Sequence, residues 1–296
     1  MLRTLLFALA ILVAVPAVQA QDAYDQDVIG EFLEREGALP DAPVEYAVYR
    51  IAHPSGNSIL GRLALYTQVG EGDPERGRAR LRLTELFGAP SVEGLRTGDT
   101  VIMPARPADF DLNALAYAPY PRTWPGAAAI AKAVIVDKTT QTWAAYANGA
   151  LVRWGPVSSG AAHSPTPTGR FNMNWRAMER ESSEAPPGET WYMRYVMNIY
   201  AARGIHLHQY NAVLTGPPQG HGCVRMVTSD ARWLYEWSDQ WRVAADGRVT
   251  TPGTLVIVQG DEPPSDPERF VMDGNTPRRI MVELPPDPMA VPRGDQ

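Results

Sequence analysis

The 296-residue chain contains one cysteine, five histidines and no block of basic residues. A single cysteine, Cys223, cannot form an internal disulfide, so it is an intermolecular partner, an inert buried thiol or a nucleophile. The absence of a basic block and a formal net charge of −6 argue against nucleic acid as a partner. The sequence shows no phosphate-binding glycine loop and no common zinc-ligand spacing. We therefore expect no cofactor and no metal, and any chemistry must come from side chains.

Long hydrophobic runs are also missing, and the one apolar stretch near the N-terminus is short. Residues 1–20 combine a positive start at Arg3, the apolar run Leu5–Val15 and the small-x-small pattern Val18–Ala20, which is typical of a signal peptide. An uncleaved anchor is the alternative. We expect export to the periplasm or cell envelope, no membrane span after cleavage, and a monomer. Because cysteines usually pair in such a compartment, the solitary Cys223 is informative.

Composition and periodicity divide the chain into segments and predict a mainly β fold. The catalytic part is expected to be a β-sandwich or mixed sheet with one helix, Ser229–Trp241, preceded by a small α+β domain. Asn148-Gly149 is a strong hairpin signal, and a tryptophan stripe on the helix is expected in the core. The expected segments are a signal peptide (1–20), a polar N-terminal segment (21–45), a small domain (46–104), a proline-rich linker (105–130), a catalytic domain (131–259) and a proline-rich, largely mobile tail (260–296), in which only 278–284 is strand-like.

The residues around Cys223 favour a catalytic thiol over an inert buried one. His221 precedes it by two residues and Arg225 follows by two, so on a strand these side chains would share a face. His206 and His208 alternate in the same way on an upstream strand and could reach the thiol. A thiol needs a base or a positive field to become a nucleophile. A zinc site formed by the cysteine and histidines is the alternative, but no carboxylate stands close by in the sequence.

Several motifs together resemble the L,D-transpeptidase catalytic domain of the YkuD type. The resemblance covers about residues 131–259. Its pieces, in chain order, are Val136–Asp137 with Tyr146–Gly149, Pro156–Gly160 with Thr166–Phe171, Leu207–Gln209, and His221–Met226. Separately, Leu95–Pro104 weakly resembles the end of a LysM domain, a module that binds N-acetylglucosamine polymers.

The family resemblance implies a reaction and a role for each site residue. Cys223 would attack a peptidoglycan tetrapeptide stem, release D-alanine and pass the acyl group to an amine, with His208 as proton donor and acceptor. The remaining expectations are that His221 orients the thiol, Gly222 frees backbone amides for an oxyanion, Arg225 supports the loop or binds a carboxylate, and His206 and Tyr210 contact substrate.

The same resemblance leaves rival functions open and shows one departure. Gly220 stands where the family usually has Ser or Thr. The partners would be stem peptides and glycan, and carbapenems would acylate the thiol. The alternatives are a hydrolase that uses the same cysteine and a non-catalytic cell-wall-binding protein. His206 remains the alternative to His208 as the proton donor and acceptor.

Overall fold

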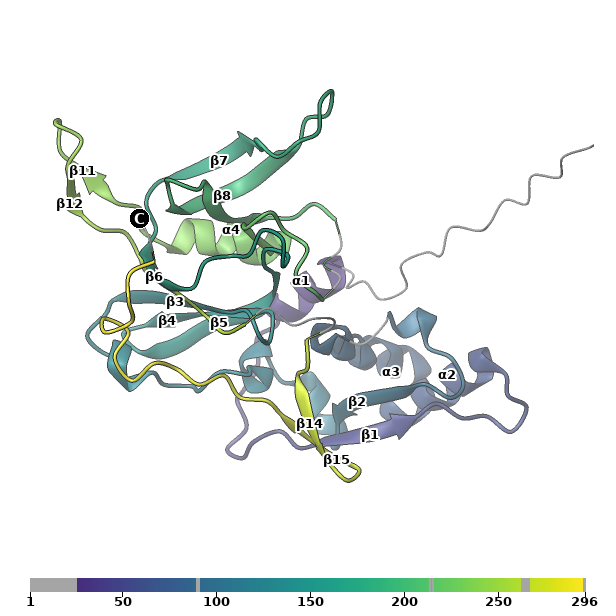
Figure 1. Cartoon of the computed structure of the whole chain (residues 1–296). Helices are drawn as coiled ribbons and strands as arrows, with labels where there is room; N and C mark the ends of the chain where they lie inside the picture. The colour runs from purple at the N-terminus through teal and green to yellow at the C-terminus, as the bar shows by residue number, and fades with distance from the viewer. Residues whose placement is uncertain (1–25, 89–90, 213, 215, 262–266, 295–296) are drawn as a thin grey trace, which may run out of the picture.

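The computed structural model describes residues 26–88, 91–212, 214, 216–261 and 267–294 (Figure 1). The predicted signal peptide, residues 1–20, lies outside these ranges. The fold is mainly β, as predicted, and its centre is a mixed sheet of nine strands. In spatial order the strands are β6 (Gly169–Asn172), β13 (Leu255–Gln259), β3 (Lys132–Asp137), β4 (Thr142–Ala147), β5 (Ala150–Ser158), β10 (Val224–Met226), β9 (Ile205–Gln209), β8 (Tyr192–Tyr200) and β7 (Arg176–Glu181).

The centre of the sheet follows directly from the sequence pattern. Strands β3 and β13 are runs of β-branched and apolar residues, and they pair in parallel with almost every side chain buried. The predicted hairpin between β4 and β5 is confirmed. Asn148 has φ 50° and Gly149 has φ 75°, the positive values that a type I′ turn requires.

Helix α4 (Thr228–Trp237) packs on one face of the sheet against β8 and β9. It ends four residues before the predicted Trp241. The helix begins at Thr228, one residue before the predicted Ser229. Asp230 lies in the first turn of the helix, is fully buried and accepts hydrogen bonds from Arg153 and Trp143. Trp233 and Trp237 of α4 are half-buried, stack with ring centroids 5.1 Å apart and pack against a hydrophobic core cluster, which confirms the predicted core packing for these two rings.

The N-terminal part contains the expected α+β unit, with one more helix than predicted. Its elements are α1 (Gln26–Glu34), β1 (Tyr46–Arg50), α2 (Ser58–Val69), α3 (Pro74–Leu81), η1 (Arg82–Phe87), η2 (Val92–Gly94) and β2 (Thr100–Pro104). Strands β1 and β2 pair antiparallel. The apolar residues Leu81, Leu83, Leu86 and Phe87 predict one helix over 78–87, whereas α3 ends at Leu81 and gives way to the 3₁₀ helix η1. Helix α2 was missed because Ile59, Leu60 and Leu63 on its outer face are exposed and hide the amphipathic pattern. The LysM resemblance stays a prediction.

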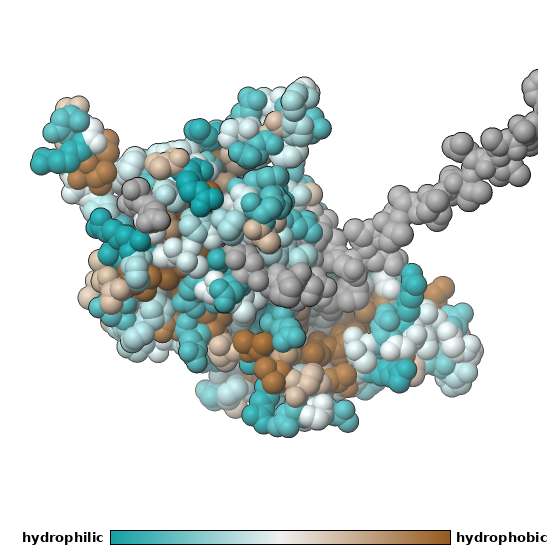
Figure 2. All heavy atoms as spheres, in the orientation of Figure 1, coloured by the Kyte–Doolittle hydropathy of each residue, from teal (hydrophilic) through white to brown (hydrophobic). Residues whose placement is uncertain are grey.

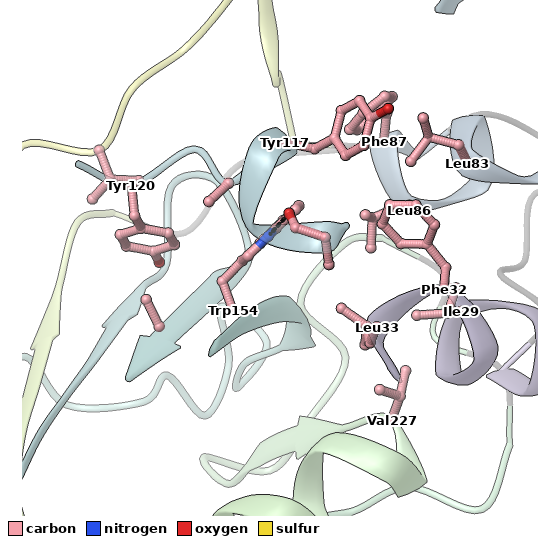
Figure 3. Packing of buried hydrophobic residues seen from close by; sticks show 14 of the residues in the cluster. Ile29, Phe32, Leu33, Leu83, Leu86, Phe87, Tyr117, Tyr120, Trp154 and Val227 are labelled. Atoms are coloured by element: carbon pink, nitrogen blue, oxygen red, sulfur yellow. Dashed lines mark hydrogen bonds between the residues drawn. The ribbon is translucent and has the colours of Figure 1, made fainter. Parts of the chain in front are cut away.

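Residues 105–130 pack against the rest of the protein and do not form the extended linker predicted from their prolines. They contain three short 3₁₀ helices, η3 (Pro107–Asp111), η4 (Ala114–Tyr117) and η5 (Pro125–Ala127). Phe110, Tyr117, Tyr120 and Trp124 are buried in one hydrophobic cluster with α1 and Trp154 of β5. Figure 3 shows Tyr117, Tyr120 and Trp154 of this cluster. Burial of four aromatic rings outweighs the local preference of proline for extended chain.

The C-terminal residues 267–294 also pack on the protein, contrary to the expected mobile tail. The hairpin β14 (Phe270–Asp273) and β15 (Thr276–Arg279) lies beside β1. Of the predicted strand at 278–284, residues 278 and 279 belong to β15, and residues 280–284 are irregular. Val282 N–H donates to Pro119 O (2.7 Å), and Trp124 Nε1 donates to Pro285 O (2.7 Å). A second small hairpin, β11 (Arg242–Val243) and β12 (Val249–Thr251), projects from the sheet. Within the described ranges, no helix has the length and apolar character needed to cross a bilayer.

Candidate active site

One pocket of about 490 Å³ brings the predicted site residues together. One wall consists of β9, β10 and the residues next to them. The other wall consists of the hairpin β7–β8, which projects from the sheet in Figure 1. Of the residues predicted from the sequence, the pocket is lined by His206, His208, Tyr210, His221, Cys223 and Arg225. The hairpin wall, which the sequence did not predict, contributes among others Arg180, Glu181, Glu184, Trp191 and Tyr192.

The loop around Cys223 has a different geometry from the predicted strand. Gly222 has φ 99°, a left-handed conformation, so residues 221–223 form a bend and β10 begins only at Val224. His221 and Cys223 therefore do not share a strand face. His221 is exposed, with its ring 5.8 Å from that of His163 and 6.4 Å from that of Trp191. His163, an exposed turn residue, thus lies beside His221 at the site.

Two glycines and one threonine shape this loop. The Thr166 hydroxyl donates to Gly222 O (2.8 Å) and accepts from the backbone N–H of Gly160 (2.8 Å). A Cβ at Gly220 would lie 2.8 Å from the carbonyl oxygen of Cys223. The backbone here has no room for the Ser or Thr that the family usually carries at this position, which accounts for the departure. Thr166 lies in a motif of the sequence, but its contact with the loop around Cys223 could not be predicted from that motif.

The Cys223 thiol is half-buried and lies against the start of β9. Its Sγ is 3.6 Å from Gly204 O. Burial raises the pKa of the Cys223 thiol above its ordinary value, although the backbone N–H of His206 and the charge of Arg225 pull it down; Glu184 adds to the rise. The thiol is therefore protonated at neutral pH and needs a base before it can attack.

Strand register places both upstream histidines on the same face as the thiol. In the parallel pair, Val224 lies opposite Leu207 and Arg225 opposite His208, so Cys223 falls beside His206. Alternation then puts His206, His208, Cys223 and Arg225 on one face. The predicted shared face of the two histidines is confirmed.

Hydrogen bonding gives His208 the features of a base. Its Nδ1–H donates to the carbonyl oxygen of Gln209 (2.6 Å), which leaves Nε2 unprotonated in the neutral ring. Burial lowers the pKa of His208 to about 4; the Gln209 bond opposes this and Arg225 adds to it. The ring is thus neutral at pH 7 and can accept a proton through Nε2.

Arg225 is held by Tyr210. The guanidinium lies 4.5 Å from the centre of the tyrosine ring, a cation–π contact, and the Tyr210 N–H donates to Met226 O (2.9 Å). Arg180 and Arg203 also line the pocket, as do the carboxylates of Glu181 and Glu184. Among the residues that the structure describes, no group of three or more His, Cys, Asp or Glu side chains is placed to hold a metal ion.

Residues 131–258 match the family model of the L,D-transpeptidase catalytic domain, YkuD. The match confirms the resemblance predicted for this segment from its motifs. It covers less than half of the chain, and no curated protein matches the chain significantly.

Solved L,D-transpeptidases are similar at low identity. The enzyme from Mycobacterium smegmatis is 18% identical over 44% of this chain and 58% of its own, with a TM-score of 0.35. L,D-transpeptidase 3 from Mycobacterium tuberculosis, in complex with a faropenem-derived adduct, is 21% identical over 44% and 60%, with a TM-score of 0.36. The enzyme from Stackebrandtia nassauensis is 20% identical over 73% and 98%, with a TM-score of 0.42. The chain thus spans less than two thirds of the two mycobacterial enzymes.

Proposed function

We propose that this protein is a peptidoglycan L,D-transpeptidase that acts in the cell envelope. The observation that carries the proposal is the placement of Cys223 and a neutral His208, with its proton on Nδ1, in one pocket of a segment that matches this family. The substrate would be a tetrapeptide stem, and the product a new amide between its third residue and an amine.

The first half-reaction needs one proton to move through His208. Nε2 accepts the proton of the Cys223 thiol as Sγ attacks the carbonyl carbon of the third stem residue. The C–N bond to the terminal residue then breaks, and the imidazolium returns the proton to the leaving nitrogen. Free D-alanine departs and a thioester remains, with all charges and atoms balanced.

The second half-reaction runs the same steps in reverse with a new amine. The acceptor nitrogen attacks the thioester carbonyl, His208 takes its proton, and the thiolate leaves and is reprotonated. The acyl energy comes from the original peptide bond, so no nucleotide is required. Arg225, fixed on Tyr210, supplies a cation for a stem carboxylate, and exposed His221 shapes the rim of the pocket beside Trp191.

His208 is preferred over His206 because of its free nitrogen. Nδ1 of His206 is occupied by the side-chain amide of Asn198 (3.0 Å), whereas Nδ1 of His208 already carries its proton toward a carbonyl. Only His208 has both a fixed tautomer and an unshared lone pair on Nε2. His206, which lies beside Cys223 in the strand register, therefore has a different role.

Mass spectrometry of products tests the proposal. Protein covering residues 21–296 is incubated with disaccharide-tetrapeptide, and D-alanine release and cross-linked dimers are expected. The Cys223→Ala variant is the matched control and should give neither. Tripeptide without dimer would identify a hydrolase that uses the same thiol. Absence of D-alanine release, together with absence of a carbapenem adduct on the protein, would contradict both.

A further inference from the structure

The side chain of Asn198 is fully buried in β8, and its partners fix which way its amide points. Its Oδ1 accepts a hydrogen bond from Nδ2 of Asn174 (2.8 Å). Its Nδ2 faces the carbonyl oxygens of Ile205 (3.2 Å) and Tyr200 (3.4 Å), which can only accept. Turning the amide over would set oxygen against oxygen and nitrogen against nitrogen. The amide NH₂ is therefore the group that faces His206.

This orientation determines the tautomer of His206. Asn198 and His206 are directly paired across β8 and β9, and Nδ2 lies 3.0 Å from Nδ1 of the ring. Since Nδ2 carries only hydrogens, Nδ1 must offer its lone pair, and the proton of the neutral ring sits on Nε2. A second proton on Nδ1 would point at the NH₂ group. Burial acts in the same direction and lowers the pKa of His206 to about 4, with further lowering by His208 and Arg180.

The neutral His206 ring thus offers a donor where His208 offers an acceptor. His206 lines the pocket and lies beside Cys223 in the strand register. With Nδ1 taken by Asn198, Nε2–H is the polar group of the ring left for a ligand. The ring is further held by Trp175, whose centroid is 5.1 Å away. The two histidines on one strand therefore have opposite tautomers and complementary capacities.

We propose that His206 is a further catalytic residue, which donates a hydrogen bond from Nε2 to the acyl oxygen that becomes negative when Cys223 attacks, and that Asn198 is the positioning residue that keeps the proton on Nε2. The proposal rests on the proposed acyl transfer. His206 keeps its proton throughout. The carbonyl π electrons move to oxygen as the C–S bond forms and return when the leaving group departs, while the travelling proton passes only through His208.

Two small reagents separate the roles of the histidines without any cell-wall substrate. Acylation of Cys223 by p-nitrophenyl acetate passes through an oxyanion, whereas alkylation by iodoacetamide does not. We expect His206→Phe to slow acylation by about 10²–10³-fold, the usual cost of one oxyanion donor, and to leave the alkylation rate unchanged. His208→Gln should slow both reactions. His206→Gln, whose amide nitrogen can reach the place of Nε2, should recover part of the acylation rate.

The positioning role of Asn198 has its own spectroscopic test. In protein with ¹⁵N-labelled histidine, the His206 signals should show Nε2 protonated and Nδ1 bare. Asn198→Asp replaces the donor with an acceptor, so the proton should move to Nδ1 and acylation should slow while alkylation stays unchanged. Asn174→Ala is the matched control for loss of buried polar contacts, because it leaves the amide of Asn198 facing the ring.

Several results would overturn the proposal. One is a wild-type His206 that carries its proton on Nδ1. Another is an unchanged acylation rate in His206→Phe, and a third is an equal loss of both rates, which would place His206 on the thiol instead of the acyl oxygen. Because these readouts need no stem peptide, they stand even if the protein fails to release D-alanine from a tetrapeptide.

Discussion

Two groups of strands in the nine-stranded sheet differ in what their faces contact. One group is buried on both faces, and the other has one face in the pocket. In β3, β4 and β13, alternate side chains enter hydrophobic clusters on both faces, so these strands are buried from both sides. In β9 and β10, one face still enters a cluster, through Leu207 and Val224. The other face carries His206, His208, Cys223 and Arg225 into the pocket.

The pocket face is the continuation of a core face. Trp154 of β5 points into the cluster shared with α1 and the 3₁₀ segments, and Ser158 on the same face pairs with Arg225 of β10. Where the N-terminal residues cover the sheet, the face is apolar. Where their cover ends, the face becomes the candidate site. Figure 2 shows a related contrast on one side of the molecule, with hydrophilic residues over the β7–β8 hairpin and apolar residues near β14.

The largest expected effect comes from a substitution in the pocket. Cys223→Ala should abolish the acyl-enzyme and all products, because no other cysteine exists in the chain. Since the side chain is half-buried and small, the thermal midpoint should change little. Intact-protein mass spectrometry after exposure to a carbapenem checks the first point and calorimetry the second. Product formation that persists in this variant would refute the assignment of the nucleophile.

The next effect distinguishes the two histidines of β9. His208→Gln should lower kcat/KM for the tetrapeptide by about 10²–10⁴-fold, the usual contribution of a general acid–base group. His206→Gln should lose less, because it keeps a neutral donor. Steady-state kinetics with D-alanine detection measures both variants. A larger loss of kcat/KM in His206→Gln than in His208→Gln would assign proton transfer to His206. It would contradict the separate roles proposed for the two histidines.

A variant in the buried ion pair between α4 and β5 should lower the stability of the protein and leave the reaction unchanged. Asp230→Ala removes the carboxylate that pairs with Arg153 and leaves a buried cation, which costs about 3–5 kcal/mol of unfolding free energy. Asp239→Ala is the control, because its ion pair with Lys132 is largely exposed and is worth about 0–1 kcal/mol. Urea unfolding measures both. Equal midpoints for the two variants would contradict the difference in burial.

The smallest expected effect is that of mild acid. The pKa values of His206 and His208 are both lowered to about 4, so the acylation rate should stay nearly flat from about pH 7 to pH 5 and fall near pH 4 as His208 gains a proton. The same lowered values stabilise the fold above about pH 6.5, and this stability is lost as pH falls toward 4. Circular dichroism at each pH separates the loss of folded protein from the loss of acylation rate. A rate that halves near pH 6.5 would show an ordinary, solvated histidine.

The local sequence pattern predicted the buried strands of the sheet well. It predicted the strands that line the pocket only in outline. The β-branched runs of β3 and β13, the Asn148-Gly149 turn and the alternation of the two histidines are signals carried by neighbouring residues. They correspond to elements and faces in the structure.

What the sequence did not predict depends on contacts between distant segments or on a single backbone angle. Thr166 contacts Gly222 across 56 positions, and Asn198 meets His206 only because two strands pair. The bend at Gly222, which separates His221 from Cys223, follows from one positive φ. The burial of 105–130 likewise requires α1 to be in place. No local periodicity reports such tertiary arrangements.

The place of β13 in the sheet has a consequence for how the chain folds. This strand pairs with β3 on one side and β6 on the other, although more than 80 residues of sequence separate it from either. Until Leu255–Gln259 is available, the apolar edge of β3 and the edge of β6 stay unpaired and open to other chains. Closing so large a loop is slow, so completion of the sheet should be a late step in refolding and the stage most prone to aggregation. A chain that is cut before Leu255 should therefore contain every residue of the candidate site and still fail to build it.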